Sequence, residues 1–403
     1  MLVAAAAGLL LRLAFGLGYW VGEPLTRDEQ EYLSLARSLA AGRGFVYDDA
    51  LGAGGPADPF DRAPGYPAFL ALVGGGHAIA TEVPAVVKIA QAFAAVFGIL
   101  IAGAIAERLA GSRSAAVAAW IAAVYPPLVA VSARAFSEAL FWPLGLAAAA
   151  LLSHAARATG SSSTKTAAVA GLVAGVAALV RPAMIVFVAV AACWLLWRRW
   201  PARVVAFTLG AALVVAPWTA RNYRVDGRLV LIAADGGVNF WIGNHPKAVG
   251  DGDLAANDAL KIAHASFRSA HPNLTERELE PAYYREAFGW IAADPTGWLA
   301  LEARKLFYLV VPVGPSYRLH SLRYEAASAG SYLLILPMAI VGVRRLGEAR
   351  KITPGLWLLA GSAVLTALVF FPQERYRLSV IDPVLIVCAG TAWARGRDAM
   401  GLA

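Results

Sequence analysis

The stretch MLVAAAAGLLLRLAFGLGYWV (residues 1–21), followed at once by GEPLTRDEQEYL (22–33), decides the character of the chain. The first part is mostly apolar and long enough for a helix to cross the roughly 30 Å hydrocarbon core of a bilayer. Asp28 and Glu29 then stand where that helix would meet water. Charged groups are costly to keep near lipid and often mark function. The polar loop that they open ends in Asp61-Arg62-Ala-Pro-Gly-Tyr-Pro67.

The composition describes a polytopic membrane protein. Of 403 residues, 59% are hydrophobic and 15% are charged, and the mean hydropathy is +0.59, which a soluble domain of this length would not reach. The net charge of +8 is scattered over loops, so it indicates membrane topology and no nucleic-acid partner. Cys193 and Cys388 lie in apolar segments, where a disulfide or metal site is not expected. The first segment lacks a basic start and a cleavage site before Glu23, so we expect a retained helix.

Hydropathy predicts an all-α fold of about ten transmembrane helices, within a range of ten to twelve. The predicted spans are 2–21, 84–106, 114–130, 136–153, 166–180, 183–197, 203–219, 330–344, 354–371 and 378–394. Basic residues follow the spans that end near residues 197, 344 and 394, and cytoplasmic loops carry an excess of Lys and Arg. The sequence therefore predicts a multi-pass protein of the inner (plasma) membrane whose active site faces outward.

Two apolar runs do not fit this orientation as crossings. Residues 64–80 contain Pro64, Pro67 and His77, and residues 297–313 carry charges in their middle. We expect both runs to lie at the outer interface. The alternative, in which both cross the membrane, keeps the parity but moves several basic loops to the outside.

The predicted outer face carries two large loops. They divide the chain into an N-terminal membrane module (1–219, with the first loop 22–83), an outer domain (220–329) and C-terminal membrane helices (330–403). In the first loop, apolar residues at helical spacing after the acidic pair predict an amphipathic helix on the membrane. In the second loop, Thr275-Glu-Arg-Glu278 predicts a capping box that opens a helix running to about Ala292.

Arginines gather at the outer ends of the predicted helices and in the outer loops, where the positive-inside rule disfavours them. These residues are Arg62, Arg134, Arg181, Arg221, Arg224, Arg375 and Arg377. For any one of them, snorkelling to headgroups is the simpler interpretation. As a group they suggest a phosphate site, because the guanidinium fork matches phosphate oxygens. A polyprenyl phosphate, whose tail stays in the bilayer, has the shape that such a site would hold.

Other candidate groups are acidic or lie in the outer domain. Glu138 is expected to begin a helix, either as a cap or as an active-site carboxylate. Asn244 and His245 lie in an aromatic-rich turn that would suit either a sugar-binding wall or a packed loop. A divalent metal is an open alternative at an acidic Gly/Pro-rich stretch, since clustered oxygens suit hard cations. That stretch holds Asp48, Asp49, Asp58 and Asp61, but their spacing defines no ligand set and favours a solvated loop.

With these residues in hand, the chain resembles the GT-C glycosyltransferases, above all the bacterial family that includes protein O-mannosyltransferases and lipid A aminoarabinose transferases. The motif Asp28-Glu29-x-x-Tyr32 looks like the acidic motif of their first loop, and Arg62-x-Pro-Gly-Tyr66-Pro looks like the motif that follows it. Pro217-Trp-x-x-Arg221-Asn, the following Asn239-x-Trp-Ile-Gly-Asn244, and Arg375-Tyr-Arg377 add to the likeness. It covers nearly the whole chain in order, and no single motif names a substrate.

The resemblance implies transfer of a sugar from a polyprenyl-phosphate donor to a lipid, glycan or protein acceptor at the outer face, usually with inversion. It implies Asp28 as the catalytic carboxylate and Arg62 and Arg221 as ligands of the lipid phosphate. Glu29 and Glu138 are the other candidate catalytic carboxylates. The remaining predicted substrate-binding residues are Tyr66, Arg134, Asn244, His245, Arg375 and Arg377.

The chain is expected to stop soon after its last span, without the family's soluble domain, so we expect a small acceptor, a lipid acceptor or a partner protein. The competing interpretations are a transporter or flippase and a non-catalytic assembly subunit. Transporters usually place charges near the midplane and often show repeated halves, whereas here the charges gather at outer helix ends and no repeat is visible. The sequence specifies neither the sugar, the acceptor nor the length of the lipid.

Overall fold

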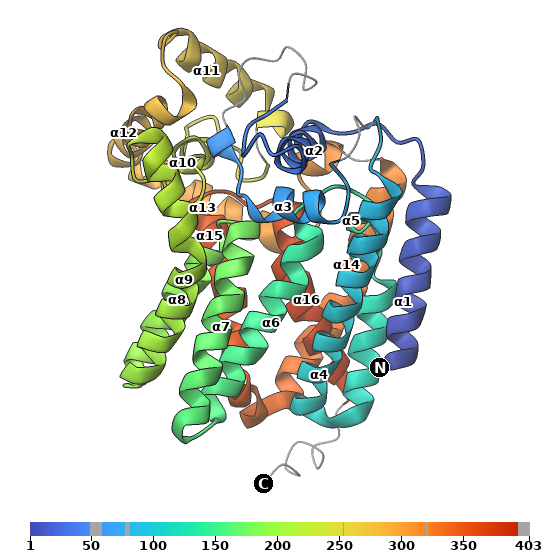
Figure 1. The fold of residues 1–403 in the computed structure, drawn as a ribbon. Helices are drawn as coiled ribbons and strands as arrows, with labels where there is room; N and C mark the ends of the chain where they lie inside the picture. The colour runs from blue at the N-terminus through green and yellow to red at the C-terminus, as the bar shows by residue number, and fades with distance from the viewer. Residues whose placement is uncertain (49–58, 77–80, 253, 320, 394–403) are drawn as a thin grey trace.

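The computed structural model describes residues 1–48, 59–76, 81–252, 254–319 and 321–393. Within these residues every regular element is helical. The long helices stand side by side as a bundle, and shorter helices cover one end of it (Figure 1). The bundle helices are α1 (Leu2–Ala14, continued by η1, Phe15–Tyr19), α4 (Ala85–Val124), α6 (Glu138–Arg157), α7 (Gly160–Val180), α8 (Met184–Trp197), α9 (Pro201–Asp226), α14 (Leu322–Leu346), α15 (Pro354–Val369) and α16 (Glu374–Gly390).

The described chain is a multi-pass membrane protein. Seven of its helices are long and apolar enough to cross a membrane, and α8 and α15 are shorter apolar helices. One of the seven, α4, folds back on itself where Ala110 and Gly111 leave helical geometry. Gly111 has a φ of +81°, a conformation that favours glycine. The two limbs of α4 therefore account for two of the predicted spans.

The predicted span 114–130 is wrong as a single helix. The second limb of α4 ends at Val124, and Pro126 opens the separate short helix α5 (Pro126–Val131). Proline disfavours helical geometry in the residue before it, and Tyr125 is extended. The buried guanidinium of Arg12 donates to the carbonyls of Ala122 and Ala123, at 3.1 and 2.8 Å. It thereby satisfies acceptors that the end of the limb leaves open.

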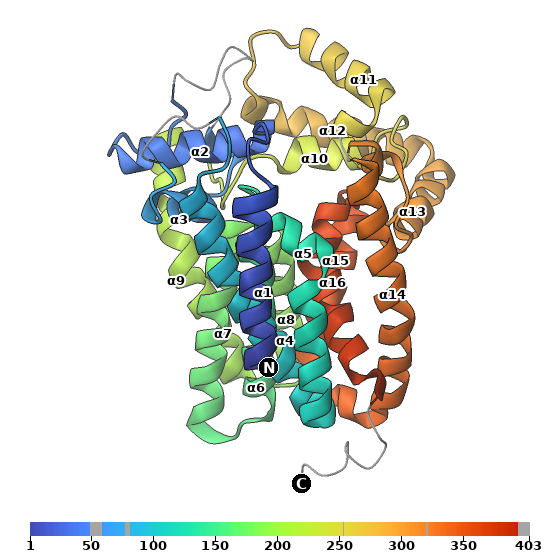
Figure 2. The same cartoon turned by 90° about the vertical axis from the view of Figure 1, so that its right-hand side faces the viewer.

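The apolar runs 64–80 and 297–313, which we expected at the interface, form no membrane-spanning helix in the described residues. Residues of the first run form α3 (Gly65–Leu72), and eight residues rise only about 12 Å. Residues 77–80 of that run lie outside the described part. The second run forms α13 (Pro295–Val310), which lies with the short helices at the end of the bundle (Figure 2). It carries Glu302, Arg304 and Lys305 within its length.

The short helices at this end come from both large loops. The first loop contributes α2 (Arg27–Ala40), which lies across the bundle (Figure 2). The second contributes α10 (Gly236–Gly243), α11 (Asp258–Ser269), α12 (Glu276–Ala293) and α13. The capping box predicted at Thr275 is present, with Glu278 accepting from the Thr275 backbone. A separate hydrophobic cluster that includes Trp241, Leu260, Leu279 and Tyr283 holds α10, α11 and α12 together.

The orientation predicted from the basic loops can be tested with single cysteines. Leu229 is 80% exposed just beyond the upper end of α9, and the Glu348 side chain is 80% exposed at the opposite end of the bundle. In a background lacking Cys193 and Cys388, Leu229→Cys should react with an impermeant maleimide added to intact cells, and Glu348→Cys should react only after lysis. The reason is that the basic turns near residue 348 favour the cytoplasm. The reverse labelling pattern would overturn the orientation.

Candidate active site

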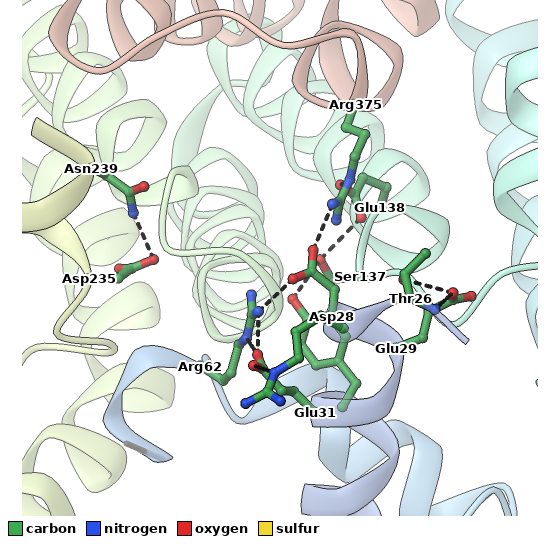
Figure 3. Close-up of polar contacts among 12 residues, drawn as sticks. Thr26, Asp28, Glu29, Glu31, Arg62, Ser137, Glu138, Asp235, Asn239 and Arg375 are labelled. Atoms are coloured by element: carbon green, nitrogen blue, oxygen red, sulfur yellow. Dashed lines mark hydrogen bonds and ion pairs between the residues drawn. The ribbon is translucent and has the colours of Figure 1, made fainter. Parts of the chain in front are cut away.

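Four segments that are distant in sequence bring charged side chains together at the covered end of the bundle (Figure 3). They are the first turn of α2, the segment around Arg62, the start of α6 and the start of α16. Asp28 and Arg375, which are 347 positions apart, form a direct ion pair.

The neighbouring carboxylates in the first turn of α2, Asp28 and Glu29, bind different partners. Glu29 accepts hydrogen bonds from the backbone and the hydroxyl of Thr26, at 2.9 and 2.8 Å, and so completes a capping box. Its other oxygen accepts from the backbone N–H of Ala135 at 3.0 Å. Glu29 is 2% exposed, so it ties α2 to the turn before α6. Asp28 points toward the arginines (Figure 3).

Asp28 lies between two guanidiniums. One carboxylate oxygen accepts from Arg62 Nη2 at 2.7 Å, and the other accepts from Arg375 Nη1 at 2.7 Å. Burial alone would raise the pKa of Asp28, but the charges of Arg62 and Arg375 and their hydrogen bonds hold it well below its usual range. In this state Asp28 is an ionised but weak base. The three side chains are 28%, 23% and 27% exposed, so a ligand can reach them.

Glu138 is the buried carboxylate of the site. It begins α6, as the sequence predicts, and its side chain has no exposed surface. Its Oε1 atom lies 2.9 Å from Arg375 Nε and 2.5 Å from Arg181 Nη1. A buried charge is tolerated only when it is paired in this way. Arg375 therefore bridges two carboxylates, Asp28 at the accessible side and Glu138 beneath it.

The ion pairs continue on the other side of Asp28. Glu31 accepts one hydrogen bond from Arg62 Nε and another from Arg27 Nε, each at 2.8 Å. Arg62 also lies over the ring of Tyr32, with 5.2 Å between the guanidinium carbon and the ring centroid. Cations and anions thus alternate along one connected path. We call this path the acid–arginine network; it runs through Arg27, Glu31, Arg62, Asp28, Arg375, Glu138 and Arg181.

Arg134 lies beside the network without joining it. Its guanidinium carbon is 5.0 Å from the centroid of Phe136, and that of Arg375 is 4.1 Å from the same centroid. Arg134 also packs on Trp20 at 5.2 Å. In the described chain its Nε atom has no hydrogen-bond partner, and no carboxylate pairs with the side chain. Arg134 therefore offers unused donors next to Arg375.

A polar pair from the second large loop lies across from Arg62. Asp235 precedes α10 and accepts from the side chain of Asn239 at 3.0 Å (Figure 3). Burial raises the pKa of Asp235, partly offset by the charge of Arg62. The sequence predictions missed Asp235, and they also missed Glu31 as a site residue. Only the position of Glu31, three residues after Asp28 on a helix, gave a signal for it.

Tyr66 supports the site from beneath. It has no exposed surface, and its hydroxyl donates to Gln91 at 2.6 Å. The amide of Gln91 donates in turn to the backbone carbonyls of Ser132 and Arg134. A side chain on Gly65 would lie 2.8 Å from the backbone of Leu179, so the Pro-Gly-Tyr motif packs against the end of α7. Tyr66 therefore fixes the turn that presents Arg134.

Arg221 lies outside the network. Its guanidinium packs against Trp218, Phe60 and Phe45, at 4.8, 5.2 and 5.9 Å from the ring centroids. It donates to the side chain of Asn222 at 3.1 Å. No described carboxylate pairs with it. This surrounding gives Arg221 a packing role between α9 and the first loop.

Arg377 points into the bundle, away from Arg375. It pairs with Asp382 at 3.1 Å and lies over the ring of Tyr332 at 3.9 Å. Asp382 also accepts from Tyr125 at 2.8 Å. Arg377 is 2% exposed. Residues two apart on a helix face nearly opposite ways, so only one of the two arginines reaches the network.

Asn244 and His245 lie in the packed turn that follows α10. The side-chain oxygen of Asn244 accepts from Trp298 at 3.0 Å and from Lys305 at 3.2 Å, and its nitrogen donates to two backbone carbonyls. The ring of His245 lies 4.3 Å from that of Trp241. Burial lowers the pKa of His245 to about 4, so the ring is neutral near pH 7. The packed-loop alternative therefore accounts for both residues.

The acidic stretch of the first loop is only partly described. Asp48 pairs with Arg37 and accepts from Ser34, and Asp49 and Asp58 lie outside the described residues. Within the described ranges, no group of three or more His, Cys, Asp or Glu side chains is placed to hold a metal ion.

A family model described as dolichyl-phosphate-mannose-protein mannosyltransferase matches residues 61–220 of the chain. That segment includes Arg62, Arg134 and Glu138. A search of the curated proteins gave no match.

Solved structures share the fold. The oligosaccharyltransferase AglB from Archaeoglobus fulgidus, in complex with an inhibitory peptide and a dolichol-phosphate, matches with a TM-score of 0.56 at 13% identity. The match covers 97% of this chain and 50% of AglB, so the chain spans about half the length of that enzyme. The same enzyme tethered to an acceptor peptide gives a TM-score of 0.56 over 97% and 49% of the two chains, also at 13% identity.

A further match has a lower score. ArnT from Cupriavidus metallidurans bound to undecaprenyl phosphate has a TM-score of 0.47 at 14% identity, over 99% of this chain and 77% of that one. The assignment of the fold therefore rests on the archaeal enzyme.

Proposed function

We propose that this chain, which has the GT-C glycosyltransferase fold, transfers a sugar from a polyprenyl-phosphate donor to an acceptor at the end of the bundle covered by α2. We place that end at the outer face of the inner membrane. One observation carries the proposal: Asp28, at an accessible position, is held between Arg62 and Arg375. Carboxylate and paired guanidiniums are the groups that glycosyl transfer from a lipid phosphate needs.

The arginines would bind the donor phosphate. Guanidinium forks bind phosphate oxygens in pairs. Arg62 and Arg375 are about a quarter exposed, and Arg134 brings donors that no described carboxylate uses. A phosphate arriving between them would exchange with Asp28 as their partner. The apolar bundle below would keep the polyprenyl tail in lipid. In AglB the fold is seen with a dolichol-phosphate, which fits this assignment.

Asp28 would then act as the general base. Once the arginines bind the phosphate, their positive charge is partly neutralised and stabilises the Asp28 carboxylate less. The pKa of Asp28 then rises toward its ordinary value. An acceptor hydroxyl attacks C1 of the sugar, its proton passes to Asp28, and the bond between C1 and the phosphate oxygen breaks. The oxygen and the bonding electrons leave with the polyprenyl phosphate. A single displacement of this kind inverts the configuration at C1.

The leaving phosphate gains charge in the transition state. The reacting sugar carbon takes on oxocarbenium character as the bond breaks. Guanidiniums fixed in advance by Glu138 and Glu31 would stabilise the departing oxygen without reorganising. The Asp235–Asn239 pair across from Arg62 would line the side from which the acceptor arrives.

Arg134→Ala is expected to weaken binding of the donor lipid by roughly 1.5–3 kcal/mol, the range for a hydrogen bond to a charged group. Arg134 forms no ion pair with a described residue, so the change leaves no stranded carboxylate. Arg62→Ala should weaken binding similarly, although it also removes one of the two arginine partners of Asp28 and one of the two of Glu31. The measurement is the dissociation constant of a polyprenyl phosphate for the purified protein.

The matched control is Arg224→Ala, because Arg224 is exposed near the end of α9 and is not one of the arginines of the acid–arginine network. Unchanged lipid affinity in both Arg134→Ala and Arg62→Ala would contradict the phosphate site and favour snorkelling.

The function itself is tested with a panel of polyprenyl-phosphate sugars offered to the protein in membranes. We expect release or transfer of one radiolabelled sugar and loss of that activity on Asp28→Asn. If no donor is consumed while a lipid-linked sugar moves between leaflets, the chain is a flippase and the proposal fails.

A further inference from the structure

A second cationic site lies at the other end of the bundle. A cavity of about 240 Å³ opens there between the first limb of α4, the last turns of α6 and the start of α15. Its lining includes Arg108, His154 and Arg157. Of these helices, α6 begins with Glu138 of the acid–arginine network and reaches the cavity with its last turns, so the cavity lies at the opposite end of the bundle from the candidate active site (Figure 1).

The charged residues that line this cavity are all basic. Arg157 donates to the backbone carbonyl of Ile352, and Arg108 is exposed and forms no ion pair with a described residue. No carboxylate is among the residues that line the cavity. Two guanidiniums of like charge therefore share one opening without an anion between them. Such a site favours an anionic ligand.

The wall of the cavity is a fixed contact between α6 and α15. The Ser153 hydroxyl donates to the carbonyl of Ala149 and accepts from the backbone N–H of Gly355, at 2.8 and 2.9 Å. A side chain on Gly355 would lie 2.1 Å from the Ala149 carbonyl oxygen, so only glycine allows this approach. The close packing of the α6 and α15 backbones thus fixes this wall of the cavity.

Apart from Ser153 and Thr353, the rest of the lining is apolar. Ile101, Ile105 and Leu356 lie below the charged rim. A soluble anion would gain nothing from these side chains, whereas a lipid places its phosphate at the rim and its chains along them. The neighbouring turns are basic as well, with Arg198 and Arg199 after α8 and Arg344 and Arg345 ending α14. They would draw anionic lipid toward this end of the protein.

We propose that this cavity binds the phosphate headgroup of an anionic phospholipid from the leaflet at the basic end of the bundle. The headgroup phosphate contacts Arg108 and Arg157, and the acyl chains run up between α4, α6 and α15. The site holds a structural lipid and takes no part in sugar transfer, so this inference stands apart from the proposed function.

The test measures lipid binding to the purified full-length protein by native mass spectrometry. Phosphatidylglycerol is compared with phosphatidylcholine of the same acyl chains. Arg108→Gln should lower the affinity for phosphatidylglycerol about fivefold, from about 1 kcal/mol per basic residue near the surface. Arg108→Lys should retain most of the binding, because it keeps the charge. Arg113→Gln is the matched control, since Arg113 is exposed near the same end and does not line the cavity.

Three outcomes would overturn the proposal. Equal affinity for the two lipids would remove the need for charge. An equal loss in Arg113→Gln would indicate a diffuse attraction without a site. Displacement of phosphatidylglycerol by inorganic phosphate at millimolar concentration would identify a site for a soluble anion. The fold can be checked independently, because Arg108 is exposed and its replacement should leave the melting temperature unchanged.

Discussion

Asp28→Asn is expected to reduce sugar transfer by about 10²-fold or more while the protein still folds, since general-base catalysis contributes typically 10²–10⁴-fold. The amide keeps the size of the side chain but cannot take the acceptor proton. It also no longer neutralises Arg62 and Arg375, so the affinity for a lipid phosphate should stay the same or increase. Loss of turnover with retained donor binding is the signature of a base.

Initial rates and donor affinity should be measured on the same preparation. Glu23→Gln is the control, because Glu23 is an exposed carboxylate of the same loop. Near-normal turnover in Asp28→Asn would contradict the assignment and direct attention to Glu138, which shares Arg375. Glu29 is a weaker substitute, because its oxygens are engaged by Thr26 and Ala135.

Arg375→Ala should lower transfer by about 10²–10³-fold, the usual effect of removing one preorganised donor from a charged transition state. Arg375 contacts both Asp28 and Glu138, so its loss removes a phosphate ligand and also takes away one of the two arginine partners of the buried Glu138, which keeps only Arg181. Breaking a buried ion pair from one side costs about 3–5 kcal/mol of stability. Part of the loss could therefore come from misfolding.

The double variant Arg375→Ala/Glu138→Gln separates these effects. It removes the buried negative charge that has lost one of its two arginine partners, so thermal stability should return toward that of the parent protein while transfer stays low. Recovery of transfer in the double variant would mean that Arg375 only neutralises Glu138. Arg27→Gln is the control, because Arg27 is 45% exposed at the end of the network and pairs with Glu31 alone.

Local sequence signals predicted much of the fold. The helix starts at Glu138 and at the Thr275 capping box are confirmed, because caps depend on side chains within one turn. The reversal in α4 agrees with the gap between the predicted spans 84–106 and 114–130, because Ala110 and Gly111 leave helical geometry within that gap. The extra break at Pro126 was missed because apolar residues continue through it.

The sequence predicted which kinds of residue form the candidate site, but it did not predict which of these residues contact one another. Arg62, Arg134 and Arg375 meet at one end of the bundle, whereas Arg221 packs among aromatic rings and Arg377 pairs with Asp382. All five had the same signal in the sequence, an arginine at an outer helix end. Which of them reaches the network depends on how each helix is rotated about its axis, and hydropathy does not specify that rotation.

The sequence by itself determined that the chain lies in a membrane, where most of its helices run and which end carries the basic turns. These properties follow from runs of apolar residues and from charge near their ends, which act over a few neighbouring positions. Only the tertiary structure decided that Glu138 meets Arg375, 237 positions away, and that Asp28 lies between two guanidiniums. An ion pair forms only when its atoms come within about 3 Å. That distance is set by the packing of α2, α6 and α16 against one another, to which every buried residue between them contributes.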